Sequence, residues 1–302
     1  MAMTVPSKRL RASRISSRAK EWLRETRQAF VQYSFERVVD LVNQESDVLA
    51  ISSHEVGAGP FSLVLEPGIF PNDIQADTQL LVFENGLWLG DWLIDAEEAE
   101  IWEAVPNWNN LISNAETNKW VAQILKVELT HHAELDSLAR LVLNPVANSP
   151  LPAKILQAAE QNIPLLFSSI QSLESSLLRK AAKGLAGLGP GLTPAGDDLL
   201  LGAMHGIWAT KPEAEAREIS SLIARAAAPR THVLSASWLE AAAEGEAAEP
   251  WHTFVDAISA RDEKSVRNAI GRILPTGHTS GSDALGGFLA VLEAGFDKAN
   301  AL

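Results

Sequence analysis

"GLGPGLTPAGDDLLLGAMHG", residues 187–206, combines a glycine-rich loop, two prolines and the beginning of an apolar helix. Glycine loses more conformational freedom on folding than any other residue, so such a run needs a structural or functional reason. A second stretch, "GHTSGSDALGG" at residues 277–287, aligns with residues 191–202 when one residue is deleted. We therefore predict two loops of the same kind, each leading into an apolar helix.

The aligned positions predict how the two helices meet. Asp198 precedes Gly202 by four residues, and Asp283 precedes Gly287 by the same interval. Four residues make about one helical turn, so each carboxylate should lie one turn from a patch without a side chain. If the helices pack through these glycines, Asp198 and Asp283 converge beside one shared pocket. The alternative is a close helix crossing with solvated capping aspartates.

Both loops carry residue types that bind anions at helix N-termini, where free N–H groups and the helix dipole favour phosphate or carboxylate. The catalytic candidates are Asp198, Asp283 and His278, the last as an acid, a base or a donor to an oxyanion. The predicted anion- and substrate-binding residues are Gly189, Gly191, Thr193, Gly196, Asp197, Gly277, Thr279, Ser280, Gly281, Ser282, Arg230 and Thr231.

Several of these residues have more than one interpretation. Thr193 followed by Pro194 is also a good N-cap and first-turn pair. Adjacent helical residues point about 100° apart, so one of Asp197 and Asp198 should cap the helix while the other faces the pocket. A Mg²⁺ ion at Asp198 and Asp283 is conceivable, because Mg²⁺ sites commonly use one or two carboxylates with substrate phosphate oxygens. The spacing is no metal signature, and no cofactor is firmly predicted.

Two further sets of polar residues lie in or between the two motifs. His205 follows Asp198 by seven residues, and we interpret it as a hydrogen-bonded core histidine. Arg230, Thr231 and Ser235 should cluster at a helix start. Arg230 could pair there with a carboxylate or phosphate, or it could be one exposed arginine on a capped amphipathic helix.

The rest of the sequence predicts an α+β protein. Short apolar or alternating runs separated by turn-prone segments favour a small, mainly antiparallel sheet or partial barrel, with a hairpin turn at Asn85 and Gly86. A helix is expected at 36–43, before the sheet. The strand-like runs lie at 47–53, 61–66, 78–84 and 87–94. We predict domains at 32–105 (β-rich) and 106–302 (helical, carrying both glycine motifs).

Helical spacing continues through the second domain. Residues 144–152 form a proline-interrupted linker within it. Beyond the linker, helices are expected at about 153–161, 164–183, 195–209, 213–227, 231–243, 250–259, 263–273 and 283–294.

The first 31 residues have a charge opposite to the rest. Eight Lys or Arg and two Glu up to residue 27 give +6, against −19 for the remainder of a chain with net charge −13. We predict a solvated basic arm leading into a helix near residues 19–31. A transit peptide or a nucleic-acid arm is the alternative.

Composition excludes some classes of function. The acidic balance argues against general binding of nucleic acid or anionic membranes. The chain has no Cys, so it forms no disulfide, thiolate nucleophile or Cys-ligated metal site. The lack of Cys fits a cytoplasmic location. The longest apolar runs are shorter than the roughly 20 residues of a membrane-spanning helix, so no membrane span is expected.

The two glycine motifs, with "THVLSASWLEAAAEG" at residues 231–245 between them, resemble the hallmarks of the bacterial AllH-type family, long catalogued as a domain of unknown function. One member is a subunit of the oxamate carbamoyltransferase of anaerobic allantoin breakdown (purine catabolism), working beside FdrA-type and AllG-type subunits. The similarity extends from near residue 35 to the end and is sharpest over the motifs. It carries over no established catalytic residues.

The resemblance implies a transferase subunit that moves a carbamoyl group between carbamoyl phosphate and a small, oxamate-like oxo-acid amide. Both molecules are small anions, which suits a pocket at two helix N-termini. One alternative is a non-catalytic assembly or ligand-sensing subunit of such a complex. Another is a Mg-dependent, phosphate-handling enzyme.

Overall fold

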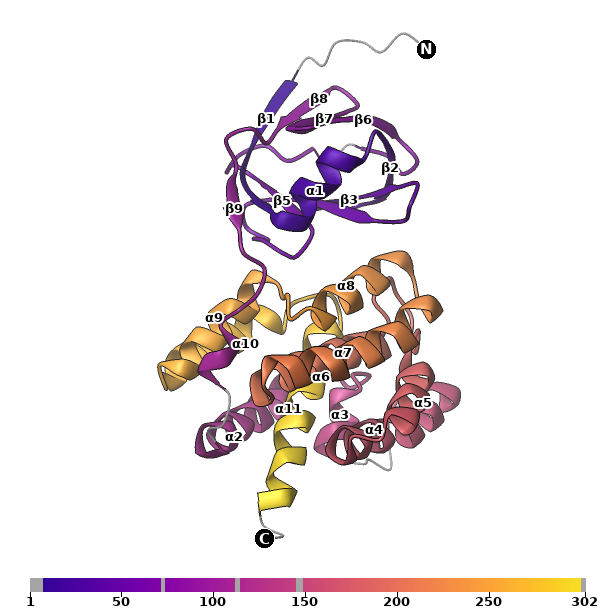
Figure 1. Ribbon diagram of the computed structural model, residues 1–302, viewed down its shortest axis with the longest axis vertical. Coiled ribbons are helices and arrows are strands. Elements are labelled where there is room, and N and C mark those ends of the chain that lie inside the picture. Colours follow the sequence, from indigo (N-terminus) through magenta and orange to yellow (C-terminus); the bar gives the residue numbers. More distant parts are fainter. Residues whose placement is uncertain (1–7, 72–73, 112–114, 145–148, 300–302) are drawn as a thin grey trace. The chain divides into compact units, whose positions relative to one another are not determined.

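The computed structural model describes residues 8–71, 74–111, 115–144 and 149–299. The chain divides into two compact units between Ala104 and Val105. Strands build the first unit and helices build the second (Figure 1), which confirms the α+β class.

Eight strands of the first unit close into a mixed barrel. They pair in the order β5-β4-β3-β2-β6-β7-β8-β1, and β1 pairs back onto β5. The β1/β8 and β4/β5 pairs are parallel, and the other pairs of the ring are antiparallel. A short ninth strand, β9 (Glu100–Trp102), adds to β1 in parallel. The ring consists of Lys8–Ser16 (β1), Gln28–Ser34 (β2), Val38–Asn43 (β3), Val48–Ser52 (β4), Ser62–Leu65 (β5), Gln79–Phe83 (β6), Gly86–Leu89 (β7) and Trp92–Asp95 (β8).

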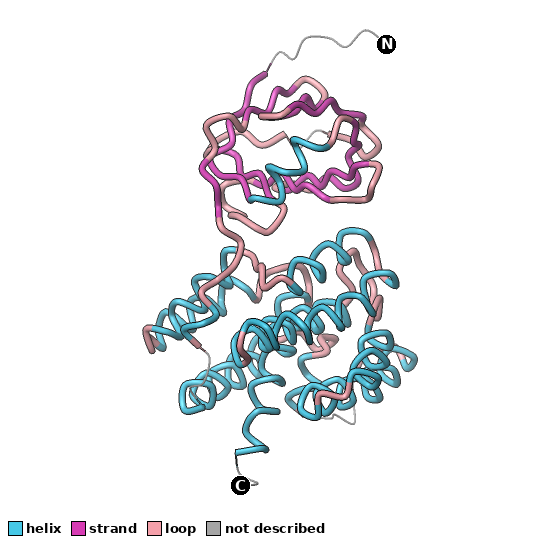
Figure 2. Tube along the Cα trace, viewed as in Figure 1, coloured by secondary structure: helices cyan, strands magenta, loops and turns pink. Residues whose placement is uncertain are grey.

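The barrel core follows from alternation along the strands, because successive side chains of a strand point to opposite faces. Helix α1 (Ser17–Glu25) adds Trp22 and Leu23 to this core and crosses the ring of strands in Figure 2. Ser16 is its N-cap, because the Ser16 hydroxyl accepts the Ala19 N–H at 3.1 Å. Buried core residues two apart on one strand include Val39 and Leu41, Leu49 and Ile51, Leu63 and Leu65, Leu87 and Leu89, and Trp92 and Ile94.

The predicted basic arm is wrong for residues 8–16, which form β1. Ala12 and Ile15 of this strand enter the barrel core, and the strand register shifts between Ala12 and Arg14. Arg9 pairs with Asp95 on the neighbouring strand, so part of the basic charge is matched within the unit. Residues 1–7 lie outside the described residues. The strand pattern was hard to see in the sequence because four of its nine residues are basic, namely Lys8, Arg9, Arg11 and Arg14.

Two further expectations for this unit are corrected. The helix expected near residues 19–31 begins at Ser17 and ends at Glu25, after which β2 follows. Most of the helix expected at 36–43 is strand β3, where Val39 and Leu41 enter the barrel core and pairing with two neighbouring strands outweighs local helical spacing.

The runs at 47–53, 61–66 and 78–84 are confirmed as strands, whereas the run at 87–94 is two strands, β7 and β8. Gly90, with φ +58°, lies in the turn between these two. The hairpin between β6 and β7 is confirmed. Glycine is needed at residue 86 for a reason other than a positive φ. A Cβ at Gly86 would overlap the carbonyl oxygen of Ile94 on β8, and Gly86 has no positive φ.

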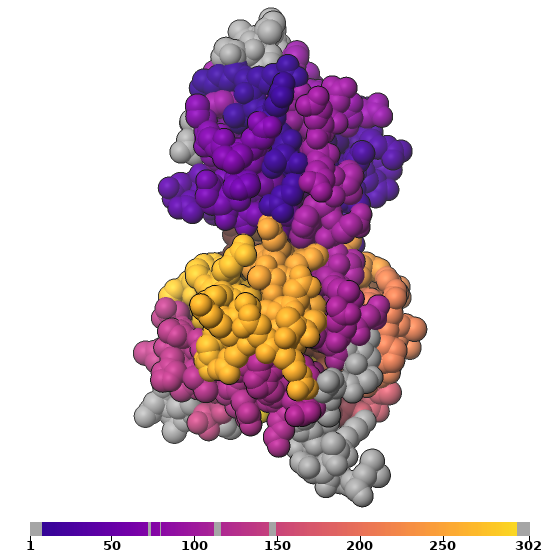
Figure 3. Space-filling model, turned by 90° about the vertical axis from the view of Figure 1, so that its left-hand side faces the viewer, coloured from indigo at the N-terminus to yellow at the C-terminus, as the bar shows by residue number. Residues whose placement is uncertain are grey.

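The described residues of the second unit form helices joined by loops, without a strand. Helices α6 and α11 make its most extensive helix pair, and nearly all of α6 is buried. Figure 3 shows residues of α9 and α10, in gold, covering one face of this unit. In the described part of the chain, no helix is long and apolar enough to cross a membrane. The helices are Ala115–His132 (α2), Ala139–Leu143 (α3), Ala153–Ser172 (α4), Ser175–Leu185 (α5), Ala195–Thr210 (α6), Glu213–Ala227 (α7), Val233–Ala243 (α8), Glu249–Ser259 (α9), Glu263–Ile273 (α10) and Ser280–Ala299 (α11), with short 3-10 turns at Trp108–Asn110 and Ala228–Arg230.

The break predicted near residue 162 is wrong, because α4 runs through Pro164 to Ser172. Proline removes one helical hydrogen bond, but Pro164 is exposed, so water can bond the carbonyl that is freed. The helix instead ends at Leu173, whose left-handed φ of 57° stops it. The linker expected at 144–152 is non-helical at its described residues, and 145–148 lie outside them.

The close approach of α6 and α11 follows from their glycines. A Cβ at Gly202 would overlap the backbone of Ala284, and one at Gly287 would overlap the carbonyl of Leu199. The backbones therefore touch directly, as the glycine spacing predicted. This contact brings the first turns of both helices together.

We predict that Gly202→Ala lowers the free energy of unfolding by about 2 kcal/mol or more, because the overlapped atoms are backbone and cannot turn away. Gly271→Ala is the matched control, since Gly271 also lies inside a helix but has no atom within 4 Å of a built Cβ. The control should gain roughly 0.5–1 kcal/mol. Urea unfolding of both variants measures the difference, and equal stability of the two would contradict the backbone contact.

Candidate functional site

Asp197 and Asp198 divide their roles at the start of α6. Asp197 accepts the Gly187 N–H at 2.9 Å, the Ser235 hydroxyl at 2.9 Å and the Thr231 hydroxyl. Burial raises the pKa of Asp197, while these three hydrogen bonds oppose that rise. The carboxylate thus ties the glycine loop to the beginning of α8.

Asp198 is the member of the pair that faces a pocket. The hydroxyls of Thr193 and Ser280 act on its carboxyl and oppose the rise of its pKa, and the two hydroxyl oxygens lie 3.1 Å from each other. These two residues come from the two glycine motifs, so the motifs meet at Asp198. The Oδ2 atom of Asp198 is buried and has no hydrogen-bond partner.

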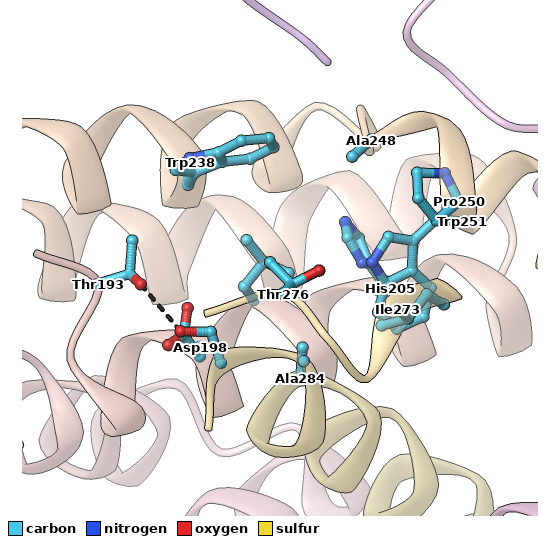
Figure 4. Close-up of a pocket in the computed structure, with 13 residues that line it drawn as sticks. Thr193, Asp198, His205, Trp238, Ala248, Pro250, Trp251, Ile273, Thr276 and Ala284 are labelled. Atoms are coloured by element: carbon cyan, nitrogen blue, oxygen red, sulfur yellow. Dashed lines mark hydrogen bonds between the residues drawn. The ribbon is translucent and has the colours of Figure 1, made fainter. Parts of the chain in front are cut away.

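The pocket is a cavity of about 130 Å³ that begins at Asp198 and is largely apolar. Figure 4 shows Trp238, Trp251 and Pro250 around it, from α8 and α9. The described residues that line it include no Lys or Arg. They are Thr193, Asp198, Leu201, His205, Trp238, Ala248, Pro250, Trp251, Ile273, Thr276, Ser280, Gly281 and Ala284.

Burial favours the neutral form of both motif carboxyls. It raises the pKa of Asp198 well above the ordinary value, and the nearby carboxylates of Asp283 and Asp197 raise it further. Burial also raises the pKa of Asp283 to about 6, against hydrogen bonds from its neighbours. Two buried acids without a cationic partner therefore lie at the helix crossing.

Asp283 does not line the pocket, so the prediction that both aspartates face it is half wrong. Its Oδ1 accepts the Ser137 hydroxyl at 2.6 Å and the Ala139 N–H at 3.3 Å, at the start of α3. Its Oδ2 is buried without a partner. The sequence could not show that the segment before α3 packs on α11, so Ser137 was missed.

His278 lies outside the pocket. Its side chain is 71% exposed, and its Nε2 lies 3.3 Å from Oδ1 of Asp136. Arg230 is also exposed, and the described residues show no ion pair for it. The placement of Arg230 matches the exposed-arginine alternative, and His278 is not among the residues that line the pocket.

The structure shows what several of the motif glycines do for loop geometry and close packing. The N–H of Gly196 donates to the Leu188 carbonyl at 2.8 Å, and the N–H of Gly281 donates to the Thr276 carbonyl at 3.0 Å. Both donors are therefore committed within the fold. Gly187 (φ +68°) and Gly191 (φ +99°) adopt left-handed conformations that glycine permits at no steric cost.

Four predicted binding residues remain, namely Gly189, Gly277, Thr279 and Ser282. Gly189 and Gly277 also have positive φ, and the Thr279 carbonyl accepts the Asp283 N–H at 2.8 Å. Ser282 is buried beside Asp283 in the chain. These four residues do not line the pocket.

His205 belongs to the pocket, which the sequence interpretation missed. The expectation of a hydrogen-bonded core histidine is confirmed, because the ring is buried and Nε2 lies 3.2 Å from the Glu246 carbonyl. The ring also contacts Trp251, with centroids 4.6 Å apart. The seven-residue interval from Asp198, two turns along one helix face, was the available signal.

The described residues contain no group of three or more His, Asp or Glu side chains that could hold a metal ion. A Mg²⁺ ion at Asp198 and Asp283 stays a prediction, and it would need water or substrate oxygens to complete its coordination.

We predict that Asp283→Asn stabilises the protein at pH 8. The folded-state pKa, about 6, exceeds the ordinary value of 3.8, so the wild-type free energy of unfolding falls as pH rises from 3.8 to about 6. Removing this titration should gain on the order of 2 kcal/mol at pH 8, and the gain should vanish near pH 4. Thermal unfolding from pH 4 to pH 8 measures it.

Asp262→Asn is the control, because exposed Asp262 caps α10 and its pKa is lowered by hydrogen bonds from Ser265. This variant should show no gain at pH 8. A gain in both variants, or in neither, would contradict the buried-carboxyl explanation.

No solved structure matches this chain. Residues 185–292 match the family model described as oxamate carbamoyltransferase subunit AllH. The matched segment includes both glycine motifs and every residue that lines the pocket. The resemblance found in the sequence is confirmed over this segment, where the chain is similar to the AllH family.

Proposed function

We propose that this chain is a subunit of a carbamoyltransferase of the oxamate type. In this proposal the pocket between α6, α8, α9 and α11 binds the small acid that accepts the carbamoyl group. The observation that carries the proposal is that the whole pocket lining falls within the segment matching the AllH family.

The pocket's Asp198 end suits a carboxylate. Asp198 is held toward its neutral form, so its O–H can donate to an anionic oxygen. The hydroxyls of Thr193 and Ser280 lie beside it. The N-termini of α6 and α11, which are the positive ends of their helix dipoles, lie at these two hydroxyls. A monoanionic acid therefore finds hydrogen-bond donors without a cationic side chain.

Carbamoyl phosphate fits this end less well. A phosphate group is normally held by Arg, Lys or a row of free backbone N–H groups, and the described lining offers no Lys or Arg. The N–H groups of Gly196 and Gly281 are already used. We infer that a partner protein supplies the phosphate site, with FdrA-type and AllG-type subunits as the candidate partners.

In the proposed reaction, an amide nitrogen of the bound acid attacks the carbamoyl carbon. The new C–N bond forms as the C–O bond to phosphate breaks, and the nitrogen's proton leaves with phosphate. This chain would bind and orient the acceptor, which turns a collision of two molecules into a positioned step.

A second candidate is a non-catalytic, ligand-sensing or assembly subunit, which the absence of cationic side chains from the lining also favours. Mixing experiments separate the two. Carbamoyl transfer is measured with the chain alone, with partner subunits alone and with all subunits together. A complex whose activity is unchanged by leaving this chain out would contradict a catalytic contribution.

We predict that Asp198→Ala weakens oxamate binding by the assembled complex about tenfold or more, because it removes a donor from a buried site. Wild-type affinity should fall as pH rises through the raised pKa of Asp198, since the ionised carboxylate repels the ligand's carboxylate. Asp198→Asn keeps a neutral donor and should show no such fall. Calorimetric titration at several pH values measures all three proteins.

Asp262→Asn serves as the matched control for Asp198→Asn, because Asp262 is exposed on the cap of α10. It should bind oxamate like the wild type at every pH. A wild-type affinity that rises with pH would show that Asp198 works as an ionised group and would contradict this role.

A further inference from the structure

The protonation state of His205 is fixed by its surroundings. Its Nε2 lies 3.2 Å from the Glu246 carbonyl oxygen, which can only accept a hydrogen bond. Nε2 must therefore carry the proton. Complete burial lowers the pKa of His205 to about 4, so the ring is neutral near pH 7. Its other nitrogen, Nδ1, is then a bare acceptor.

The described residues provide no donor for this acceptor. Nδ1 of His205 is buried without a hydrogen-bond partner among them, and the residue lines the pocket. Leaving a buried acceptor unsatisfied is unfavourable, so native proteins normally provide a protein, water or ligand donor. A ligand with an N–H or O–H group at the His205 end of the pocket would satisfy this acceptor.

The two ends of the pocket differ in the hydrogen bonds that they can form with a ligand. Asp198 and His205 lie seven residues apart on α6, so their Cα atoms are separated by about 10 Å along the helix axis. Asp198 can donate to an anionic oxygen, whereas Nδ1 of His205 can only accept. A ligand that satisfies both ends is extended, with an acidic group at one end and a donor at the other.

The walls between these ends select shape. Trp238 and Trp251 line the cavity, and Figure 4 shows Trp251 beside His205 and Trp238 nearer to Thr193 and Asp198. Aromatic walls pack well against flat groups. A terminal carbamoyl group, –CO–NH₂, is flat and supplies an N–H donor, and a cavity of about 130 Å³ admits only a small molecule.

We propose that the pocket binds a small ureido acid lengthwise, with its carboxylate at Asp198 and its terminal NH₂ donating to Nδ1 of His205. His205 is then a specificity-determining residue that recognises the carbamoyl end of the ligand. This proposal deepens the proposed function, and rests on it for the assignment of the carboxylate to Asp198.

The test uses two acids of the same shape and charge. N-carbamoylglycine ends in NH₂, and N-acetylglycine carries a methyl group at the same position. Calorimetric titration of the full chain should show about tenfold tighter binding of N-carbamoylglycine, because only its NH₂ can donate to Nδ1. Equal affinities for the two acids would overturn the proposal.

His205→Gln isolates the acceptor. The Gln amide can still donate to the Glu246 carbonyl, but the imidazole nitrogen that faces the ligand is lost. The preference for N-carbamoylglycine should fall to about one. N-acetylglycine should bind this variant within about threefold of its wild-type affinity, which shows an intact pocket. A preference that survives in His205→Gln overturns the role of Nδ1.

His132→Gln makes the same exchange at an exposed histidine of α2 and should leave the preference unchanged. Carbamoyl transfer by the assembled complex is measured separately. Transfer without a preference for N-carbamoylglycine leaves the proposed function standing and overturns this inference. A His205-dependent preference without transfer supports the ureido site and contradicts the transferase role.

Discussion

The direct backbone contact between α6 and α11 is the constraint on which the helical unit depends. Gly202 and Gly287 leave no side chain between the helices, so the carbonyls of Ala284 and Leu199 occupy that space. Each contact lies one turn from an aspartate, and the first turns of both helices meet as a result. Any side chain at these glycines would separate the helix starts, together with the hydroxyls of Thr193 and Ser280 that lie 3.1 Å apart there.

The crossing gathers three buried carboxyls and assigns them unequal surroundings. Asp197 accepts three hydrogen bonds, two of them from residues at the beginning of α8. Asp283 accepts two at the start of α3. Asp198 has the two motif hydroxyls beside it. Asp198 and Asp283 each keep one buried oxygen without a partner among the described residues, but only Asp198 lines the pocket. Similar acids therefore perform structural and ligand-facing roles, because hydrogen-bond partners are distributed unevenly around one helix crossing.

The sequence predicted the parts of the site that depend on local spacing. The repeated motif gave the paired helices, the glycine contact and the split between Asp197 and Asp198. It could not give contacts that depend on distant packing. Ser137 reaches Asp283 from 146 residues away, and the Glu246 carbonyl fixes the His205 tautomer across 41 residues. The error at β1 has a different origin, since its apolar positions are interrupted by basic side chains that suggested a solvated arm.

The pocket's polarity limits what this chain does alone. Its described lining offers one acid held toward neutrality, one neutral histidine and three hydroxyls, but no Lys or Arg. Such a set can hold and orient a small acid, because hydrogen-bond donors and helix dipoles need no full positive charge to bind one carboxylate. Stabilising the additional charge of a leaving phosphate requires cationic side chains, a metal ion or free backbone donors. Those groups must come from outside this lining, which makes a division of the chemistry between subunits the physically consistent arrangement.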